Sequence, residues 1–178
     1  MPANRKADVD AAVKDVDFTK NTYQIELDTT EGKILLDLWP DVAPGHCKNI
    51  IGLSKIGFYD GVTFHRVIDG FMSQGGCPLG TGTGDAGYKL PQEFNDKAHV
   101  PGVLSMARAQ HPDSAGSQFF ICVAEARFLD KQYTAYGKTA NDESLKVVQK
   151  IGKVRTGAND KPVTPVKINK ASVIEKAK

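Results

Sequence analysis

The residues best suited to chemistry lie between positions 64 and 76, where the sequence reads FHRVIDGFMSQGG. Within this stretch the permanent cation Arg66 has aromatic and thioether neighbours, and Gln74 and two glycines follow it. A cation beside an apolar surface suits a neutral, partly apolar group that must be polarised. Residues 118–121 (QFFI) offer a second strand of similar character. On its own Arg66 would be interpreted as an exposed strand arginine, so the interpretation depends on its neighbours.

A glycine-rich string, residues 82–87 (GTGDAG), matches the dinucleotide fingerprint G-x-G-x-x-G but lacks the required context. No buried parallel strand precedes it, and Pro91 prevents a long helix after it. Ala107 stands where a ribose-binding acid would be sought. We therefore interpret the string as a flexible surface loop and predict no nucleotide cofactor.

The histidines, cysteines and serines form no recognisable catalytic or metal motif. No His or Cys pair has the short spacing typical of structural zinc, so we expect neither a metal nor a cofactor. His111, Asp113 and Ser114 supply the residue types of a hydrolase triad without a nucleophile elbow, and we interpret them as loop residues. Cys122 lies in an apolar run and is predicted to be buried, whereas Cys77 lies in a predicted loop and could be exposed.

Length and composition are those of an ordinary globular protein. The 178 residues fit one domain and include 40% hydrophobic and 25% charged residues. A net charge of +2 with scattered lysines gives no footprint for nucleic acid. No apolar run approaches the roughly 20 residues that span a bilayer. The three cysteines are an odd count without close spacing. We expect no nucleic-acid or membrane partner and a reducing, cytoplasmic location.

The chain alternates between short strands and two isolated helices. Period-two patterns predict a hairpin from residues 23–27 and 33–39, and further strands at 62–68, 71–74, 102–107, 118–124 and 165–175. Helices are predicted at 44–57 and 141–152. Residues 1–20 are charged throughout and are interpreted as a mobile arm or a marginal helix, which leaves 21–178 as the domain. This pattern indicates a closed barrel with capped ends.

Four separated segments together strongly resemble the cyclophilin family of peptidyl-prolyl isomerases. They are residues 64–76, 102–107 (GVLSMA), 116–122 (GSQFFIC) and 128–130 (FLD), in the family's order and at compatible spacing. The resemblance runs from about Tyr23 to Val173 and is greater to bacterial-type members. It implies a mainly β fold: a closed eight-stranded antiparallel barrel capped by two α-helices, with the substrate groove outside the barrel wall. The implied activity is cis-trans isomerisation of X-Pro bonds without a cofactor.

The resemblance implies a role for individual residues. Arg66 resembles the catalytic arginine, with Phe71 and Gln74 beside it in the catalytic set. The implied substrate-binding residues are Met72, Ala107, Arg108, Ala109, Gln118, Phe120, Phe128, Leu129 and Tyr133. Arg66 is expected to polarise the imide of an X-Pro bond while an apolar pocket holds the proline ring.

Local geometry bears on several of these assignments. Strand alternation places Phe120 on the groove face and Phe119 in the core. Phe71 and Met72 are adjacent, so both can line the groove only if the strand bends or begins there, which Gly70 makes plausible. Five residues stay open between lining the groove and serving only packing or the loop: Gly80, Thr81, Met106, Ala107 and Ala109.

Three groove residues depart from well-known eukaryotic members, which carry Trp, His and Asn at the positions of Phe128, Tyr133 and Arg108. Phe128 keeps an aromatic wall but lacks the indole N–H, so we expect weakened cyclosporin binding. Tyr133 keeps a ring with a polar tip. Arg108 adds a cation, and we hypothesise that it favours substrates with an acidic residue close to proline.

A second function is compatible with the same residues. A proline-peptide binding module or scaffold would use the groove without depending on isomerisation, and binding without turnover would favour it. In either case the expected partners are proline-containing peptides and unfolded or folding proteins. The sequence has no heptad seam and no sustained exposed apolar face, so we expect a monomer.

Overall fold

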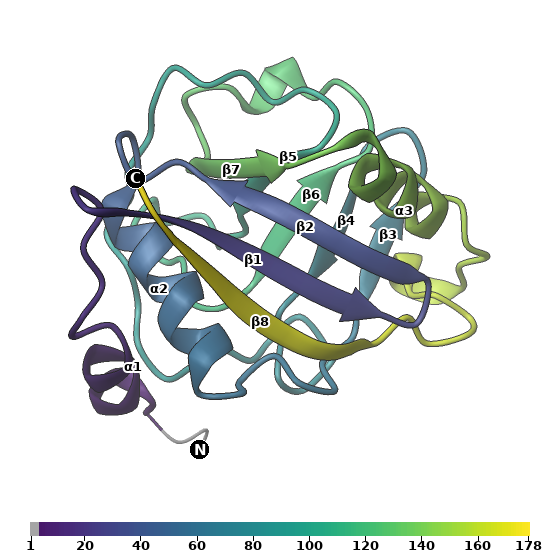
Figure 1. Cartoon of the computed structure of the whole chain (residues 1–178). Helices are drawn as coiled ribbons and strands as arrows, with labels where there is room; N and C mark the ends of the chain where they lie inside the picture. Colours follow the sequence, from purple (N-terminus) through teal and green to yellow (C-terminus); the bar gives the residue numbers. More distant parts are fainter. Residues whose placement is uncertain (1–3) are drawn as a thin grey trace.

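An antiparallel sheet curls around the centre of the molecule (Figure 1). The computed structural model describes residues 4–178, and the first three residues of the predicted N-terminal arm lie outside this range. The sheet has eight strands in the order β3-β4-β6-β5-β7-β2-β1-β8. Their bounds are β1 Asn21–Thr29, β2 Gly32–Leu38, β3 Arg66–Ile68, β4 Met72–Gly75, β5 Val103–Met106, β6 Phe119–Cys122, β7 Ala135–Thr139 and β8 Ile168–Ala177.

The curl brings the two ends of the strand order together. Thr63 and Lys167 form an isolated antiparallel bridge. The backbone N–H of Phe64 donates to the carbonyl of Val166 at 2.9 Å. These contacts join the segment before β3 to the segment before β8. The prediction of eight antiparallel strands is confirmed, and within residues 4–178 the two ends meet at this bridge rather than along a full ladder.

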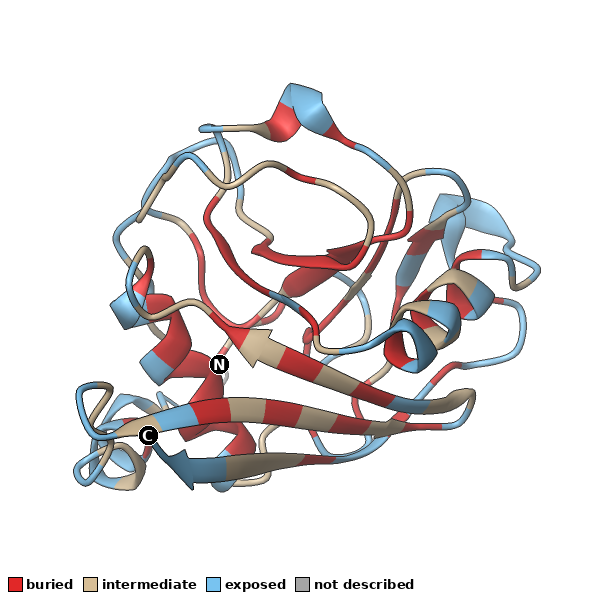
Figure 2. Ribbon diagram, turned by 45° about the horizontal axis from the view of Figure 1, so that its top comes forward, coloured by how far each residue is buried: buried red, intermediate tan, exposed pale blue. Residues whose placement is uncertain are grey.

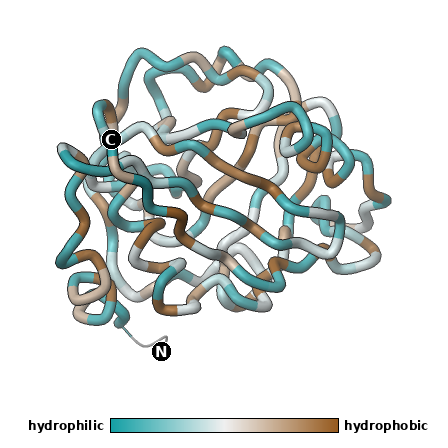
Figure 3. Tube along the Cα trace, in the orientation of Figure 1, coloured by the Kyte–Doolittle hydropathy of each residue, from teal (hydrophilic) through white to brown (hydrophobic). Residues whose placement is uncertain are grey.

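The hairpin of β1 and β2 follows the alternation of its sequence. Along β1 the buried residues are every second one, including Tyr23, Ile25 and Leu27, and Ile34 and Leu36 continue the pattern on β2. Figure 2 shows this alternation as bands along both strands. Hydrophobic stretches gather in the strands and helices at the centre, whereas the outer loops are mostly hydrophilic (Figure 3). The apolar face of the hairpin therefore packs inward.

Three α-helices accompany the sheet within residues 4–178: α1 Lys6–Ala12, α2 Pro44–Lys55 and α3 Asp142–Gly152. The two predicted helices correspond to α2 and α3. At the start of α3, the Asn141 side chain accepts the N–H of Ser144 at 2.8 Å, which satisfies one of the free donors of the first turn. Helix α1 lies within the predicted N-terminal arm. Two 3₁₀ turns complete the elements, η1 Arg127–Leu129 and η2 Ala158–Asp160.

Strand β7 was not predicted, because its sequence AYGKT has no clear period-two pattern. It lies between β2 and β5, with Gly137 opposite Leu38 and Leu104. A Cβ atom on Gly137 would lie 2.4 Å from the carbonyl oxygen of Asp37. The missing side chain at this position therefore lets two backbones approach closely.

The idea that Cys77 is exposed is wrong. Its side chain is fully buried, and its Sγ accepts backbone N–H groups from Gly82 at 3.3 Å and Gly84 at 3.2 Å. Burial raises the pKa of the Cys77 thiol, but hydrogen bonds from these and neighbouring amides outweigh burial and lower it overall. The glycine-rich loop thus folds around the sulfur atom.

The strands β4, β5 and β6 separate two apolar clusters. Phe119 and Ile121 belong to the main core inside the curl. Phe120 and Cys122 belong to a smaller cluster on the other face, together with Met72, Val103, Ala126, Leu129 and Ala135. The predicted alternation of β6 is confirmed. The smaller cluster supports the outer face of the sheet, where the candidate site lies.

Candidate active site

Three neighbouring strands place one side chain each in a row across the outer face. Arg66 on β3 is opposite Gln74 on β4, and Gln74 is opposite Phe120 on β6. Directly paired residues of antiparallel strands project to the same face. The sheet register therefore sets a cation, an amide and an aromatic ring side by side. The ring of Phe120 is almost fully buried, whereas Arg66 is exposed.

A cavity of about 140 Å³ lies against this row. It is lined by Arg66, Phe71, Met72, Gln74, Ala107, Arg108, Phe120, Leu129 and Tyr133, and we call it the apolar pocket. Phe71 and Met72 both reach it because β4 begins at Met72, just after Gly70 adopts a positive φ of 74°. The sequence required the strand to bend or begin at these two residues if both were to line the groove, and β4 does begin there.

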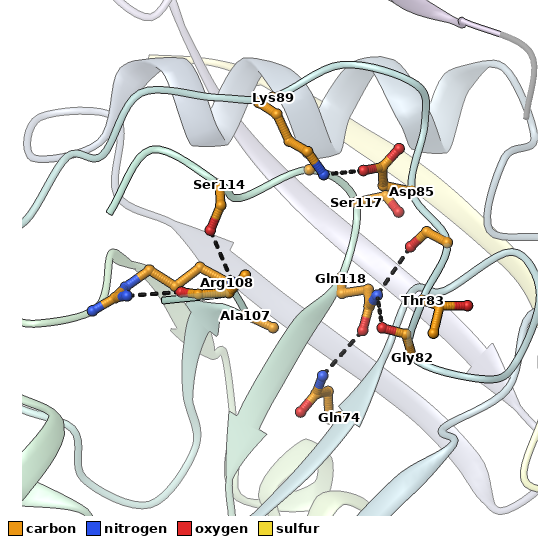
Figure 4. A pocket seen from close by; sticks show the side chains of 13 residues that line it. Gln74, Gly82, Thr83, Asp85, Lys89, Ala107, Arg108, Ser114, Ser117 and Gln118 are labelled. Atoms are coloured by element: carbon orange, nitrogen blue, oxygen red, sulfur yellow. Dashed lines mark hydrogen bonds and ion pairs between the residues drawn. The ribbon is translucent and has the colours of Figure 1, made fainter. Parts of the chain in front are cut away.

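The amides of Gln74 and Gln118 form a relay that ends at Arg66. Gln118 Nε2 donates to the carbonyls of Gly82 and Gly84, each at 2.9 Å. Gln74 Nε2 donates to Gln118 Oε1 at 3.1 Å, and Arg66 Nη1 donates to Gln74 Oε1 at 3.4 Å. Carbonyl oxygens only accept, so they fix the orientation of Gln118, which in turn fixes that of Gln74. Figure 4 shows the two glutamines linked in this way.

A second cavity, of about 240 Å³, adjoins the apolar pocket and shares Gln74, Ala107 and Arg108 with it. We call it the flanking pocket. Its other walls come from loops, one of which leads into β6, and they are Gly82, Thr83, Gly84, Asp85, Lys89, Ala109, Ser114, Gly116, Ser117 and Gln118 (Figure 4). Ala109 and Gln118 thus lie in this pocket rather than in the apolar one.

A third cavity lies on the other side of Arg66, and we call it the loop groove. It has a volume of about 610 Å³ and shares Arg66 and Gln74 with the apolar pocket. Gly80 and Thr81 line it together with residues of the η2 turn. Both residues therefore line a cavity, which was one of two alternatives; the other was that they only form the loop. The three cavities make a continuous series with Gln74 in common.

Comparison with known proteins agrees with this geometry. Residues 22–173 match the family described as cyclophilin type peptidyl-prolyl cis-trans isomerase/CLD. The chain belongs to the cyclophilin family. It is 54% identical over 128 residues to a peptidyl-prolyl cis-trans isomerase of Synechococcus elongatus, covering 72% of this chain and 88% of that one. It is 43% identical over 152 residues to an isomerase of Schizosaccharomyces pombe, covering 83% of this chain and 96% of that one.

Solved structures give the same fold. A cyclophilin type isomerase of Cryptosporidium parvum superposes with a TM-score of 0.81 at 29% sequence identity, covering 86% of this chain and 98% of that chain. A second structure of that protein was determined in the presence of the dipeptide Ala-Pro and superposes with a TM-score of 0.80. The protein is thus a cyclophilin-type peptidyl-prolyl cis-trans isomerase, as the resemblance implied.

Phe128 stands apart from the rest of the predicted set. It does not line the apolar pocket; its side chain is 66% exposed, and its ring packs on Phe71 with 5.5 Å between centroids. Its position in the η1 turn puts it beside the pocket wall rather than in it. Met106 is buried in the main core, so it does not serve the groove of this cyclophilin.

The guanidinium of Arg108 is held firmly at the edge of the apolar pocket. Its Nε and Nη2 donate to the carbonyl of Gln132 at 3.1 and 2.9 Å, and its Nη1 donates to the carbonyls of Ala109 and Gln110 at 2.9 Å. Its Cζ lies 4.6 Å from the ring centroid of Tyr133. Arg108 therefore joins two loops of the cyclophilin site and places its guanidinium beside the pocket.

A polar network that the sequence did not predict lies behind the apolar pocket. His99 is fully buried, and its ring stacks on Phe120 with 6.1 Å between centroids. His99 Nδ1 lies 3.1 Å from Asp130 Oδ1, and His99 Nε2 lies 2.8 Å from Ser105 Oγ. Asp130 directly follows Leu129 in the chain. The network therefore connects two residues that line the pocket, Phe120 and Leu129. Its partners are far apart in sequence, and no local motif signals it.

The charges of this network follow from its surroundings. Burial lowers the pKa of His99, although the hydrogen bond and charge of Asp130 oppose the change. Burial alone would raise the pKa of Asp130, but hydrogen bonds from Arg127 and from the backbone and ring of His99 hold it at about 2. Near neutral pH the network therefore pairs a neutral imidazole with a carboxylate.

Within residues 4–178, no group of three or more His, Cys, Asp or Glu side chains is arranged to hold a metal ion. No helix in the described part of the chain is long and apolar enough to cross a membrane.

Proposed function

We propose that Arg66 is the catalytic residue of this cyclophilin and that it stabilises the twisted X-Pro bond. Rotation about a peptide bond has to overcome a barrier of about 18 to 20 kcal/mol, because resonance is lost. As resonance is lost, the imide nitrogen becomes pyramidal and gains a lone pair that can accept a hydrogen bond. A guanidinium N–H directed at this nitrogen stabilises the transition state more than the ground state.

The relay supports this role for Arg66 and gives Gln74 a part in catalysis. Gln74 Oε1 faces the guanidinium because Gln118 and two loop carbonyls leave its amide only one favourable orientation. A donor that is already oriented does not have to reorganise during the reaction, which is the main advantage of a protein site over water. The sequential hydrogen bonds thus prepare Arg66 for a substrate.

The apolar pocket is proposed to hold the proline ring. Phe71, Met72, Phe120 and Leu129 offer aromatic, thioether and aliphatic surface next to Arg66. An apolar site removes competing water from the imide and strengthens the hydrogen bond from the arginine. The Cryptosporidium parvum relative was crystallised in the presence of Ala-Pro, and this agrees with a site for a prolyl residue.

The neighbouring cavities are proposed to hold the peptide on either side of proline. The flanking pocket contributes Ala109 and Gln118, and the loop groove lies beyond Arg66. Extended, unfolded segments can enter such an open series of cavities, so the proposed substrates are proline-containing peptides and unfolded or folding proteins. Cyclosporin is expected to bind weakly, because Phe128 has no indole N–H to donate.

We also propose that the protein acts as a monomer in the cytoplasm. Its three cysteines are free and buried, which agrees with a reducing compartment. In residues 4–178 the exposed large apolar side chains are Leu79, Phe128 and Val163, and they belong to three different segments. Scattered side chains of this kind do not require a partner surface.

The observation that carries the proposed roles is the row of Arg66, Gln74 and Phe120 against an apolar pocket. The test measures the rate of cis-trans exchange of an X-Pro peptide with wild type and with Arg66→Ala, and peptide binding is measured in parallel. Loss of a transition-state donor is expected to lower turnover about 100-fold while binding changes far less. Undiminished turnover by Arg66→Ala would remove Arg66 from the mechanism. Peptide binding by the wild type without turnover would instead favour a binding module.

A further inference from the structure

The N-terminal helix α1 lies outside residues 22–173, the part of the chain that matches the family. It packs against α2 (Figure 1), and Gly52 lies at this contact. A Cβ atom on Gly52 would lie 2.6 Å from Cγ1 of Val9 and 3.0 Å from Cγ1 of Val13. Val9 is only 4% exposed. The bare backbone of Gly52 is therefore a notch that accepts the apolar side of α1.

The same N-terminal segment reaches the loop of residues 82–89. The backbone N–H of Arg5, next to α1, donates to the carbonyl of Ala86 at 2.9 Å, and Ala86 is fully buried. Burial raises the pKa of Tyr88 to about 12, and the charge of Asp10 on α1 adds to this effect. The loop is thus joined to the N-terminal segment by a hydrogen bond, and Tyr88 lies within reach of the charge of Asp10.

The 82–89 loop is in turn connected to a wall of the flanking pocket. The Tyr88 hydroxyl donates to Asn49 Oδ1 on α2, and Asn49 Nδ2 donates to the carbonyl of Gly116 at 2.9 Å. A Cβ atom on Gly116 would lie 2.9 Å from the Cβ of Asp85. Asp85 and Gly116 both line the flanking pocket. A continuous set of contacts therefore leads from α1 to this pocket.

We propose that α1 is a positioning element that fixes the 82–89 loop and thereby determines which side chains next to proline the flanking pocket accepts. The inference rests on the proposed function of the three cavities. Helix α1 touches no substrate; it acts through the loop. Its effect belongs to substrate selection, because its contacts with the loop are with Ala86 and Tyr88. Gly82 and Gly84, whose carbonyls orient Gln118, are held separately by hydrogen bonds to the buried Sγ of Cys77.

Gly52→Ala tests the proposal, because its methyl group fills the notch while alanine suits the interior of α2 better than glycine does. KM is expected to rise about tenfold for a peptide with a large side chain next to proline, since small misplacements at a binding wall are costly. KM for the matching glycine peptide and kcat for both peptides stay unchanged. Val9→Ala combined with Gly52→Ala is expected to restore KM, because it removes the Val9 methyl group that lies closest to the added Cβ atom.

Val9→Asp is a second way to displace α1, and Ala11→Ser, an exposed position on α1, is the matched control. Hydrogen exchange of the α1 amides confirms the displacement in each variant. Displaced α1 with unchanged KM for both peptides would overturn the proposal, and so would an equal loss of activity on both peptides. Absence of turnover of the glycine peptide by the wild type would instead contradict the proposed function.

Discussion

The two pockets that meet at Gln74 are built from different kinds of structure. The row of Arg66, Gln74 and Phe120 in the apolar pocket lies on β3, β4 and β6, and a buried apolar cluster supports it from below. The flanking pocket is formed mostly by loop residues, and Gln118 is tied to one of these loops by hydrogen bonds to the carbonyls of Gly82 and Gly84. Side chains on paired strands are held by register and packing, whereas loops move more easily. We therefore propose that residues on the sheet carry the chemistry and that loop residues select the substrate.

The strongest test of this division is Arg66→Lys, set against Thr83→Ala in the flanking pocket. Lysine keeps the positive charge but lacks the planar fork of donors, so kcat is expected to fall about 30-fold with a smaller change in binding. Thr83→Ala is expected to change KM alone. Exchange spectroscopy on one X-Pro peptide, with binding measured by calorimetry, gives both quantities. Equal losses of kcat and affinity in Arg66→Lys would remove the distinction between the two pockets.

A smaller effect is expected from the network below the apolar pocket. The pKa of His99 in the folded protein lies below its usual value because burial outweighs Asp130. In the unfolded chain the imidazole takes up a proton near pH 6.5, so below that pH the unfolded state binds more protons. The free energy of unfolding therefore falls as the pH drops from about 6.5 towards the folded pKa, by at most about 1.4 kcal/mol per pH unit.

His99→Gln provides the comparison for this pH dependence. His65 has a lowered pKa as well and contributes in the same direction, so the variant keeps part of the slope. Chemical denaturation of both proteins between pH 7.5 and about 5 measures the difference, over the range in which an unfolded histidine titrates. Identical slopes for the two proteins would show that folding does not lower the pKa of His99.

The smallest expected effect concerns Arg108, which borders both pockets. Its charge is predicted to favour peptides with an acidic residue close to proline by about threefold at low salt, because exposed charges interact weakly and are screened. Arg108→Asn is expected to abolish the preference. A peptide series that varies only this residue, assayed at low and high salt, is the measurement. Equal turnover of acidic, neutral and basic peptides by the wild type would dismiss the preference.

The sequence predicts most of the sheet and much of the site, for identifiable reasons. Alternation correctly separated Phe119 from Phe120, because a strand with one face in each cluster requires it. The resemblance brought together the residues of the apolar pocket, which separate strands, loops and the η1 turn contribute. Strand β7 was not predicted, because its sequence lacks a period-two hydrophobic pattern. Gly137 is required there by the close backbone of Asp37, which the sequence of β7 does not reveal.

Other features depend on partners that a local pattern cannot reveal. The burial of Cys77 follows from amides five and seven residues later that turn back onto the sulfur. His99 is buried beside Phe120 because Asp130, 31 residues away, satisfies its backbone and ring. Phe128 was expected in the pocket wall, but the η1 turn leaves it exposed beside Phe71. Long-range hydrogen bonds and turn geometry account for what the sequence did not show.

The orientation of Gln118 has a consequence for the ageing of the protein. Its amide nitrogen faces two carbonyl oxygens, those of Gly82 and Gly84. Spontaneous hydrolysis of this amide would put a negatively charged acceptor against both oxygens and leave Gln74 without a fixed direction. Conversion of Gln118 to glutamate would then disorient Arg66 through Gln74, although Gln118 itself does not contact the guanidinium. The order of the whole relay thus depends on the chemical integrity of a single side-chain amide.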